Sequence, residues 1–136
     1  MARKKIGELI SGQSVLIASP DMNVRDAVHW MIRENRPAIL IEREHHLIGI
    51  FTENDALSRV LAEGRDPVVT KLHEVMTRNP VALTPEHTLL DAFNTMRQFD
   101  FRHVAVISDG RAAGVLSLRD FLDVDITRLA AYLEAD

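Results

Sequence analysis

The stretch Gly49-Ile50-Phe51-Thr52-Glu53-Asn54-Asp55 decides the fold, because it occurs twice in the chain. The second copy is Gly114-Val115-Leu116-Ser117-Leu118-Arg119-Asp120, which keeps the glycine, the apolar pair, the hydroxyl residue and the aspartate in the same order. An apolar run precedes each copy, and a helical pattern follows it. Each copy therefore predicts a strand that ends at Thr52 or Ser117 and a helix that begins there.

The segments around these two copies also correspond. Residues 20 to 57 align with residues 85 to 122 without a gap, and each half offers a short apolar strand, an amphipathic helix, two further strands and the corner. Two such halves, residues 1–66 and 67–136, predict an α/β (α+β) fold in which the halves bury sheet faces together and pack about a pseudo-twofold axis. The two strand-to-helix corners are then expected beside a shared groove.

Local signals predict the ends of the long helices. Ser19-Pro20-Asp21 and Thr84-Pro85-Glu86 indicate helix starts, with the hydroxyl residue as N-cap and the proline in the first turn. Pro37 predicts that the first long helix ends near Asn35. Trp30 falls opposite the core face of that helix, where either an incidental position or a dimer contact is expected. Apolar residues at helical spacing predict the core face of each of three helices. The three sets are Val24, Ala27, Val28, Met31 and Ile32; Ala56, Leu57, Val60 and Leu61; and Leu122, Ile126, Leu129 and Leu133. For the last set, contact with a second chain is the alternative.

Composition and charge exclude several classes of protein. The net charge is −4, from 16 basic and 20 acidic residues, which gives no basic surface for nucleic acid. No apolar segment is long enough to cross a bilayer, and no apolar signal core follows the basic start, so we expect neither membrane insertion nor export. The absence of cysteine excludes disulfides and thiolate sites and suits a cytoplasmic protein. The six histidines lack ligand spacing, so no metal site is expected.

The corner allows a structural and a functional interpretation. Thr/Ser-x-x-Asp is the spacing of a capping box, in which the hydroxyl caps the helix and the acid binds the backbone N–H of the cap residue. The same arrangement suits a ligand, because helix N-terminal amides bind phosphate oxygens and an aspartate accepts both hydroxyls of a ribose. One such corner alone is most often a cap. Two copies in register favour a binding site at each.

Two further motifs, together with the corners, carry a resemblance to a known family. Val75-Met76-Thr77-Arg78-Asn79-Pro80-Val81 and Arg102-His103-Val104-Ala105-Val106 make the chain, from residue 6 to residue 130, resemble a pair of cystathionine beta-synthase (CBS) domains, also called a Bateman module. The resemblance implies two β-α-β-β-α CBS repeats, commonly dimerised, that bind an adenosine-containing ligand and act as sensors. AMP, ADP or ATP is the favoured ligand, S-adenosylmethionine or a dinucleotide is less favoured, and no cofactor is required.

The resemblance also implies roles for individual residues. Asp55 and Asp120 would hold ribose hydroxyls, while Thr52 and Ser117 would face ribose or phosphate. Arg119 would bind phosphate, whereas its counterpart in the first copy is an uncharged asparagine, so the second corner is expected to be the better site. Further candidates are Val81 and Leu16, which would line the adenine slot, Arg36 and Arg102, which would serve phosphates or be solvated, and His103, which would face the groove or pack ordinarily.

These observations predict a stand-alone regulatory module rather than an enzyme. The chain has no nucleophile elbow and no Gly-x-x-x-x-Gly-Lys phosphate loop. The expected partners are the adenine nucleotide, a second copy of the chain in a homodimer, and an unknown effector protein in trans. The alternative is a constitutive interaction or scaffold protein, which keeps the fold and the caps without binding a nucleotide.

Overall fold

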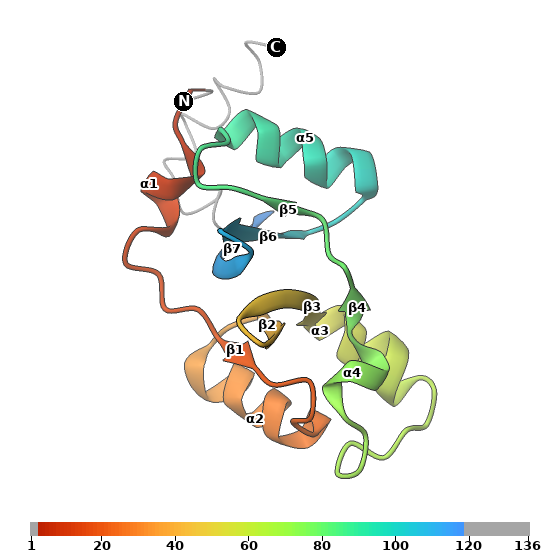
Figure 1. Ribbon diagram of the computed structural model, residues 1–136. Helices are drawn as coiled ribbons and strands as arrows, with labels where there is room; N and C mark the ends of the chain where they lie inside the picture. Colours follow the sequence, from red (N-terminus) through yellow and green to blue (C-terminus); the bar gives the residue numbers. More distant parts are fainter. Residues whose placement is uncertain (1–2, 119–136) are drawn as a thin grey trace. The chain divides into compact units, whose positions relative to one another are not determined.

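The computed structural model describes residues 3–118, which divide into two compact units (Figure 1). Unit 1 contains residues 3–13, 81–108 and 113–118, and unit 2 contains residues 14–80 and 109–112. Each unit builds its own sheet and its own hydrophobic core. The predicted apolar stripe from Leu122 to Leu133, together with Arg119 and Asp120, lies outside the described residues.

Unit 2 has a four-stranded sheet with the strand order β1-β2-β3-β4. β1 runs parallel to β2, whereas β3 runs antiparallel to both β2 and β4. Ala38 is in register with Thr52, and Gly49 with Arg78, so the first corner lies at the end of a central strand. The elements are β1 (Ile17–Ala18), α2 (Val24–Glu34), β2 (Ala38–Arg43), β3 (His46–Thr52), α3 (Glu53–Asp55), η1 (Ala56–Leu61), α4 (Leu72–Val75) and β4 (Thr77–Arg78).

The ends of α2 follow from local chemistry. Asn23 is the N-cap, and its Oδ1 accepts a hydrogen bond from the Asp26 backbone N at 2.8 Å. Asn35 ends the helix in the left-handed conformation, with φ of 53°, two residues before Pro37, as the proline predicts. The buried face packs in one cluster with strand residues: Val24, Ala27 and Met31 contact a core that includes Ile39, Ile41 and Phe51.

Both predicted helix starts at a Ser/Thr-Pro-acid sequence were wrong. Ser19 Oγ accepts a hydrogen bond from Asp21 N at 3.2 Å in a turn, and the helix begins only after Asn23. In unit 1 the corresponding helix begins after Thr88, whose hydroxyl accepts from Asp91 N at 3.2 Å. The reason is that a cap residue with an acid three positions later satisfies more of the unpaired N–H groups at a helix start than the proline turn does.

Two predictions for the faces of α2 were also wrong. Ile32, expected in the core, is 72% exposed. Trp30, expected on the opposite side, is half-buried and packs against the unit 2 cluster. A large indole at the edge of a helix face covers apolar surface that a smaller side chain on that edge would leave exposed.

The helix after the first corner is α-helical only at its beginning. α3 passes into η1, a π-helix whose wide turn includes the hydrogen bond from Ala62 N to Leu57 O at 2.9 Å. Val60 is buried, whereas Leu57 and Leu61 are 60% and 73% exposed. The predicted core face was therefore wrong at these two leucines. Ala56 and Val60 pack in the core, and each leucine comes one residue later, which turns its side chain away from the core and into solvent.

Unit 1 has a three-stranded sheet with the strand order β5-β6-β7, in which β5 runs parallel to β6. Its core joins the buried faces of α1 and α5 to the strands, in a cluster that includes Ile6, Leu89, Met96, Val104 and Leu116. The predicted strands are present. The elements are α1 (Ile6–Ile10), β5 (Ala82–Leu83), α5 (Leu89–Phe99), β6 (His103–Ser108) and β7 (Arg111–Ser117). The turn before β7 and the first two residues of β7, residues 109–112, are counted in unit 2.

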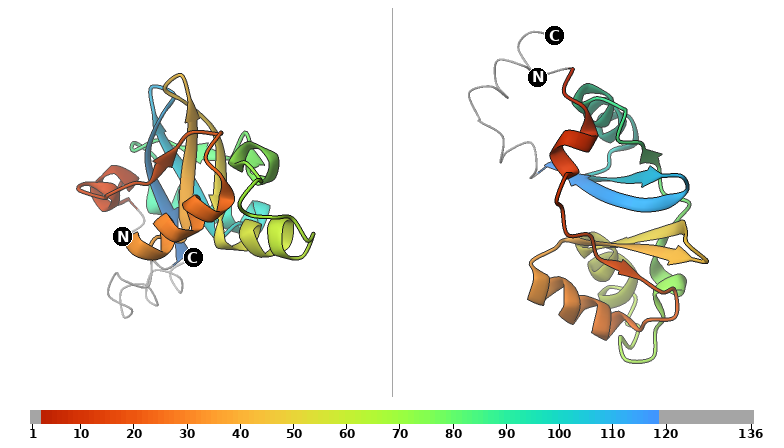
Figure 2. Two further views of the ribbon diagram at one scale, coloured as in Figure 1. Left: turned by 90° about the horizontal axis from the view of Figure 1, so that it is seen from below. Right: turned by 60° about the vertical axis from the view of Figure 1, so that its left-hand side comes forward.

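The first helix of each repeat packs in the unit built mainly from the other repeat. In unit 1, Ile6 N donates to His87 O at 2.8 Å, and Figure 2 shows α1 beside the segment that leads into α5. In unit 2, Leu72 N at the start of α4 donates to Met22 O at 2.9 Å. The sequence repeats, residues 1–66 and 67–136, and the compact units therefore divide the chain differently.

Candidate functional site

The first corner is a complete capping box. Thr52 is the N-cap of α3, and its Oγ1 accepts a hydrogen bond from Asp55 N at 3.3 Å. In return, Asp55 Oδ2 accepts from Thr52 N at 2.9 Å and from Thr52 Oγ1 at 3.2 Å. The structural interpretation of the Thr-x-x-Asp spacing is therefore correct for this corner.

The other oxygen of Asp55 has partners from elsewhere in unit 2. Oδ1 accepts a hydrogen bond from Thr77 Oγ1 of β4 at 3.4 Å and lies 3.5 Å from Arg59 Nε of η1. Asp55 is only 5% exposed. Its carboxylate thus joins three elements, the corner, η1 and β4, and ribose binding by Asp55 stays a prediction.

Sequence reasoning missed Arg59 and Thr77 as neighbours of the corner. Arg59 follows Asp55 by four positions, a spacing that brings side chains together on a helix, and this signal was available. Thr77 reaches the site only because β4 pairs with β3, where it is in register with Ile50. That pairing joins distant parts of the chain and has no local sequence signal.

The remaining first-half candidates lie in unit 2 around the same sheet. Leu16 is buried, and its carbonyl accepts from Leu40 N at 2.9 Å beside β2. Arg36 is half-buried and directly precedes Pro37, whose carbonyl accepts from Glu53 N at 3.1 Å at the corner. The backbone therefore brings Arg36 close to the corner, while Leu16 lies on the other side of β2.

The second corner is described only in part. Ser117 is buried at the end of β7, and Leu118 N donates to Arg102 O at 3.1 Å. Arg102 is exposed, and His103 is half-buried at the start of β6. Unit 1 therefore brings the Ser117 corner next to the strand start that carries Arg102 and His103, and Val81 is half-buried just before β5.

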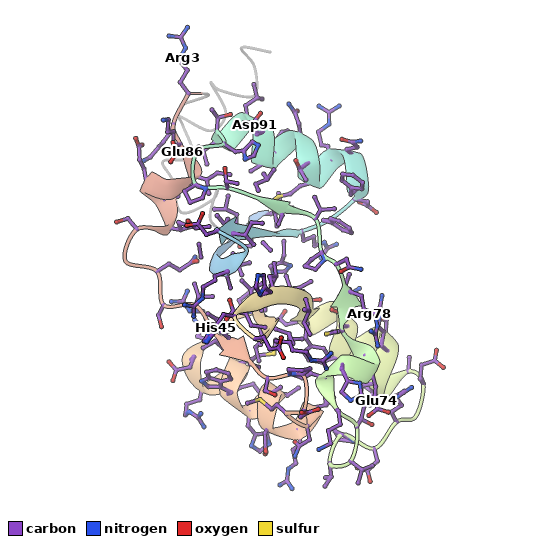
Figure 3. The ribbon with its side chains drawn as sticks, viewed as in Figure 1. Arg3, His45, Glu74, Arg78, Glu86 and Asp91 are labelled. Carbon is purple, nitrogen blue, oxygen red and sulfur yellow. The ribbon has the colours of Figure 1, made fainter. Side chains whose placement is uncertain are left out.

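Two carboxylates outside the corners, Glu74 and Asp91, cap the starts of helices. Glu74 on α4 and Asp91 on α5 lie near the helix starts that they cap (Figure 3). The hydrogen bond from Lys71 N lowers the pKa of Glu74, and that from Thr88 N lowers the pKa of Asp91. A general acid at neutral pH needs a raised pKa, and these two groups shift in the opposite direction.

Residues 3–118 show neither a metal-binding cluster nor a membrane-spanning helix. They contain no group of three or more histidine, aspartate or glutamate side chains placed to hold a metal ion. Within the same range no helix has the length and apolarity needed to traverse a bilayer.

The chain matches known proteins over most of its length. The CBS domain model matches it twice, at residues 6–62 and 72–126. The Arabidopsis thaliana CBS domain-containing protein CBSCBSPB2 is 35% identical over 78% of this chain, and the mitochondrial protein CBSX3 of the same plant is 31% identical over 89%. The chain spans about a fifth of the length of CBSCBSPB2 and about two thirds of CBSX3, at 20% and 65%.

A solved structure shares the fold closely. The hexameric CBS-CP12 protein from bloom-forming cyanobacteria superposes with a TM-score of 0.81 at 27% identity. The superposition covers 91% of this chain and 74% of that protein. The tandem repeat seen in the sequence therefore corresponds to a known architecture.

Proposed function

Because the chain belongs to the CBS domain family and carries two copies of the domain, we propose that it binds an adenine nucleotide at its corners and reports the occupancy to a partner protein. We base this on one observation: the Gly-x-x-Thr/Ser-x-x-Asp corner occurs at the same point of both matched domains. A corner that served only as a cap would not need the same hydroxyl and acid in both copies, since Asn23 caps α2 equally well.

In this proposal the ligand is AMP, ADP or ATP. Asp55 and Asp120 accept the ribose hydroxyls, and Thr52 and Ser117 contact ribose or phosphate. The adenine lies against the apolar residues Leu16 or Val81. The phosphates lie against arginines near the corners, for which Arg36, Arg102 and Arg119 are candidates, and His103 lies near the second corner. The ligand regulates only if it favours one conformation of the protein over another.

Thermal unfolding with and without ligand tests the proposal. AMP, ADP or ATP at 100 times its Kd raises the unfolding free energy by about 2.7 kcal/mol, which is a shift of several degrees in Tm for a domain of this size. Asp120→Ala should remove most of the shift. Adenosine compounds that give no shift at millimolar concentration would exclude nucleotide binding.

A second candidate function is a constitutive scaffold, and the first corner favours it. Asp55 is buried and has four contacts within unit 2, as a purely structural acid would have. A scaffold would keep the same partner protein bound whether or not nucleotide is added. Pull-down with and without ATP separates the two functions, since only the sensor changes its partner binding.

We also infer that the chain self-associates as a homodimer. Leu57 and Leu61 are exposed one turn apart on η1, and their counterparts in the second repeat, Leu122 and Ile126, are apolar as well. The CBS-CP12 protein, which shares the fold, is hexameric, and this supports self-association of the chain. Leu57→Glu should lower the mass measured by light scattering, while Ser58→Glu, at an exposed polar position, should not.

The effector and the cell compartment belong to the same proposal. The effector acts in trans, the module itself is not catalytic, and a cytoplasmic location is favoured by the lack of cysteine.

A further inference from the structure

The two oxygens of the Asp55 carboxylate have different tasks. Oδ2 binds Thr52 N at 2.9 Å and Thr52 Oγ1 at 3.2 Å, and these contacts hold the helix start. Oδ1 has only longer contacts, to Thr77 Oγ1 at 3.4 Å and to Arg59 Nε at 3.5 Å. Charge-assisted hydrogen bonds are normally about 2.7–2.9 Å long. A ligand hydroxyl can therefore exchange with the partners of Oδ1 while Oδ2 keeps the cap.

Arg59 is anchored on one side and open on the other. Its Nη1 donates to Met76 O at 2.9 Å, which fixes the guanidinium beside the corner. Its side chain is 49% exposed, so solvent reaches the group. A guanidinium has five N–H donors in a planar fork that matches phosphate oxygens. Arg59 can therefore keep its contact with Met76 O and still bind an anion.

Arg59 also supplies, from the helix after the first corner, the positive charge that position 54 lacks. Arg119 directly precedes Asp120 in the second copy, whereas Asn54 precedes Asp55 in the first. The π-helical turn of η1 brings Arg59 next to Asp55 from within the following turn. Each corner thus combines a hydroxyl, a carboxylate and an arginine, although the arginine comes from a different position of the repeat.

We propose that Arg59 is the phosphate-binding residue of the first corner and that it rests on Asp55 until a nucleotide arrives. The inference rests on the proposed nucleotide binding at the corners. The ribose hydroxyls take Oδ1 from Arg59, and the released guanidinium binds the phosphate. A nucleoside must displace the same arginine without offering an anion in return, so the first corner selects nucleotides over nucleosides.

Calorimetric titration of the Asp120→Ala chain tests this, because the first corner is then the remaining site. In that background Arg59→Gln should weaken AMP binding about tenfold or more, the value of a charge-assisted hydrogen bond. Adenosine binding should stay the same or become tighter, because Asp55 is no longer occupied. Arg59→Lys, which keeps the charge without the fork, should lie between the wild-type residue and glutamine for AMP.

Arg65→Gln is the matched control. Arg65 is 42% exposed and pairs with Glu74 at 3.4 Å in the same unit, so its loss removes a comparable ion pair away from the corner. AMP and adenosine affinities should not change in this variant. Circular dichroism of each variant confirms that it is folded, and Arg59→Lys carries the test if glutamine unfolds unit 2.

Four results would overturn the role of Arg59. Equal losses of AMP and adenosine affinity in Arg59→Gln would show that the arginine only supports the fold, and an unchanged AMP affinity would show that it does not bind phosphate. If Asp120→Ala abolishes nucleotide binding completely, the proposed function stands, but only the second corner binds the nucleotide. If neither compound binds the wild-type chain or any variant, nucleotide binding and the role of Arg59 fail together.

Discussion

β3 and β7 are equivalent strands of the two repeats, but the backbone groups at their outer edges have different hydrogen-bond partners. In unit 2 the backbone of β4 pairs with β3, with Gly49 opposite Arg78. In unit 1 a side chain replaces the strand: Gln13 Nε2 donates to Val115 O at 3.0 Å, and Gln13 Oε1 accepts from Val115 N at 3.0 Å. A carboxamide carries the same donor and acceptor as a peptide group, so one glutamine can pair with a strand edge.

Both repeats have a glycine at this strand edge, Gly49 where the partner is β4 and Gly114 where the partner is Gln13. A Cβ on Gly49 would collide with the Met76 side chain, and a Cβ on Gly114 would lie 2.9 Å from Gln13 Oε1 and 3.0 Å from Ile10. The neighbours differ, but the close approach is the same. Duplication has therefore preserved the space beside the strand rather than the residue that fills it.

The largest expected effect comes from the core position two residues after each glycine. Phe51 is fully buried in unit 2 and Leu116 is 1% exposed in unit 1. Phe51→Ala should cost about 3–5 kcal/mol and Leu116→Ala about 2–5 kcal/mol of unfolding free energy, because each leaves a cavity. Urea unfolding measures both, and a cost below about 1 kcal/mol for either would show that the two strands are not equally buried.

The glycine substitutions come next. Gly114→Ala should destabilise by about 1–3 kcal/mol, because the new methyl group overpacks against Gln13 and Ile10. Gln13→Ala removes one of these neighbours, so the double variant should be more stable than the sum of the single effects predicts. If the costs of Gly114→Ala and Gln13→Ala simply add in the double variant, Gln13 is not the reason that position 114 requires glycine.

Substitution of Gln13 tests whether its carboxamide pairs with the edge of β7. Gln13→Ala should cost about 1–2 kcal/mol, because the N–H and C=O of Val115 lose their partners in a part-buried place. Hydrogen exchange of the Val115 amide should accelerate in this variant. Gln98→Ala, at an exposed position of α5, serves as the control and should change stability by less than about 0.5 kcal/mol. Equal protection of Val115 in both variants would contradict the pairing.

The smallest effect concerns the helix caps. The hydrogen bond from Thr88 N lowers the pKa of Asp91, so its stabilisation is present above the unfolded pKa, about 3.9, and is lost as pH falls through the lower folded value. Asp91→Asn should therefore destabilise at pH 7 and differ less from wild type in acid, as urea midpoints measure.

The sequence predicts most strands and the first corner, because their apolar runs are short, buried and repeated. The starts of α2 and α5 were misplaced because Ser19-Pro20 and Thr84-Pro85 contain acceptable cap chemistry, while Asn23 and Thr88 outcompete them. Local spacing also cannot tell which side of η1 meets the core, which is why Leu57 and Leu61 were assigned to it.

The surroundings of Asp55 were the least predictable part of the site. The cap with Thr52 follows from the spacing, but Thr77 reaches Oδ1 only through the pairing of β4 with β3. The packing of α1 and α4 in opposite units depends likewise on contacts between distant residues, such as Ile6 with His87. Such contacts arise from tertiary structure and leave no periodicity in the sequence.

The placement of α1 and α4 makes the two repeats dependent on each other. A chain cut after residue 66 would give two fragments, each carrying the helix that the other fragment's core lacks. Mixed fragments can reassemble both cores, whereas a separate fragment cannot complete its own.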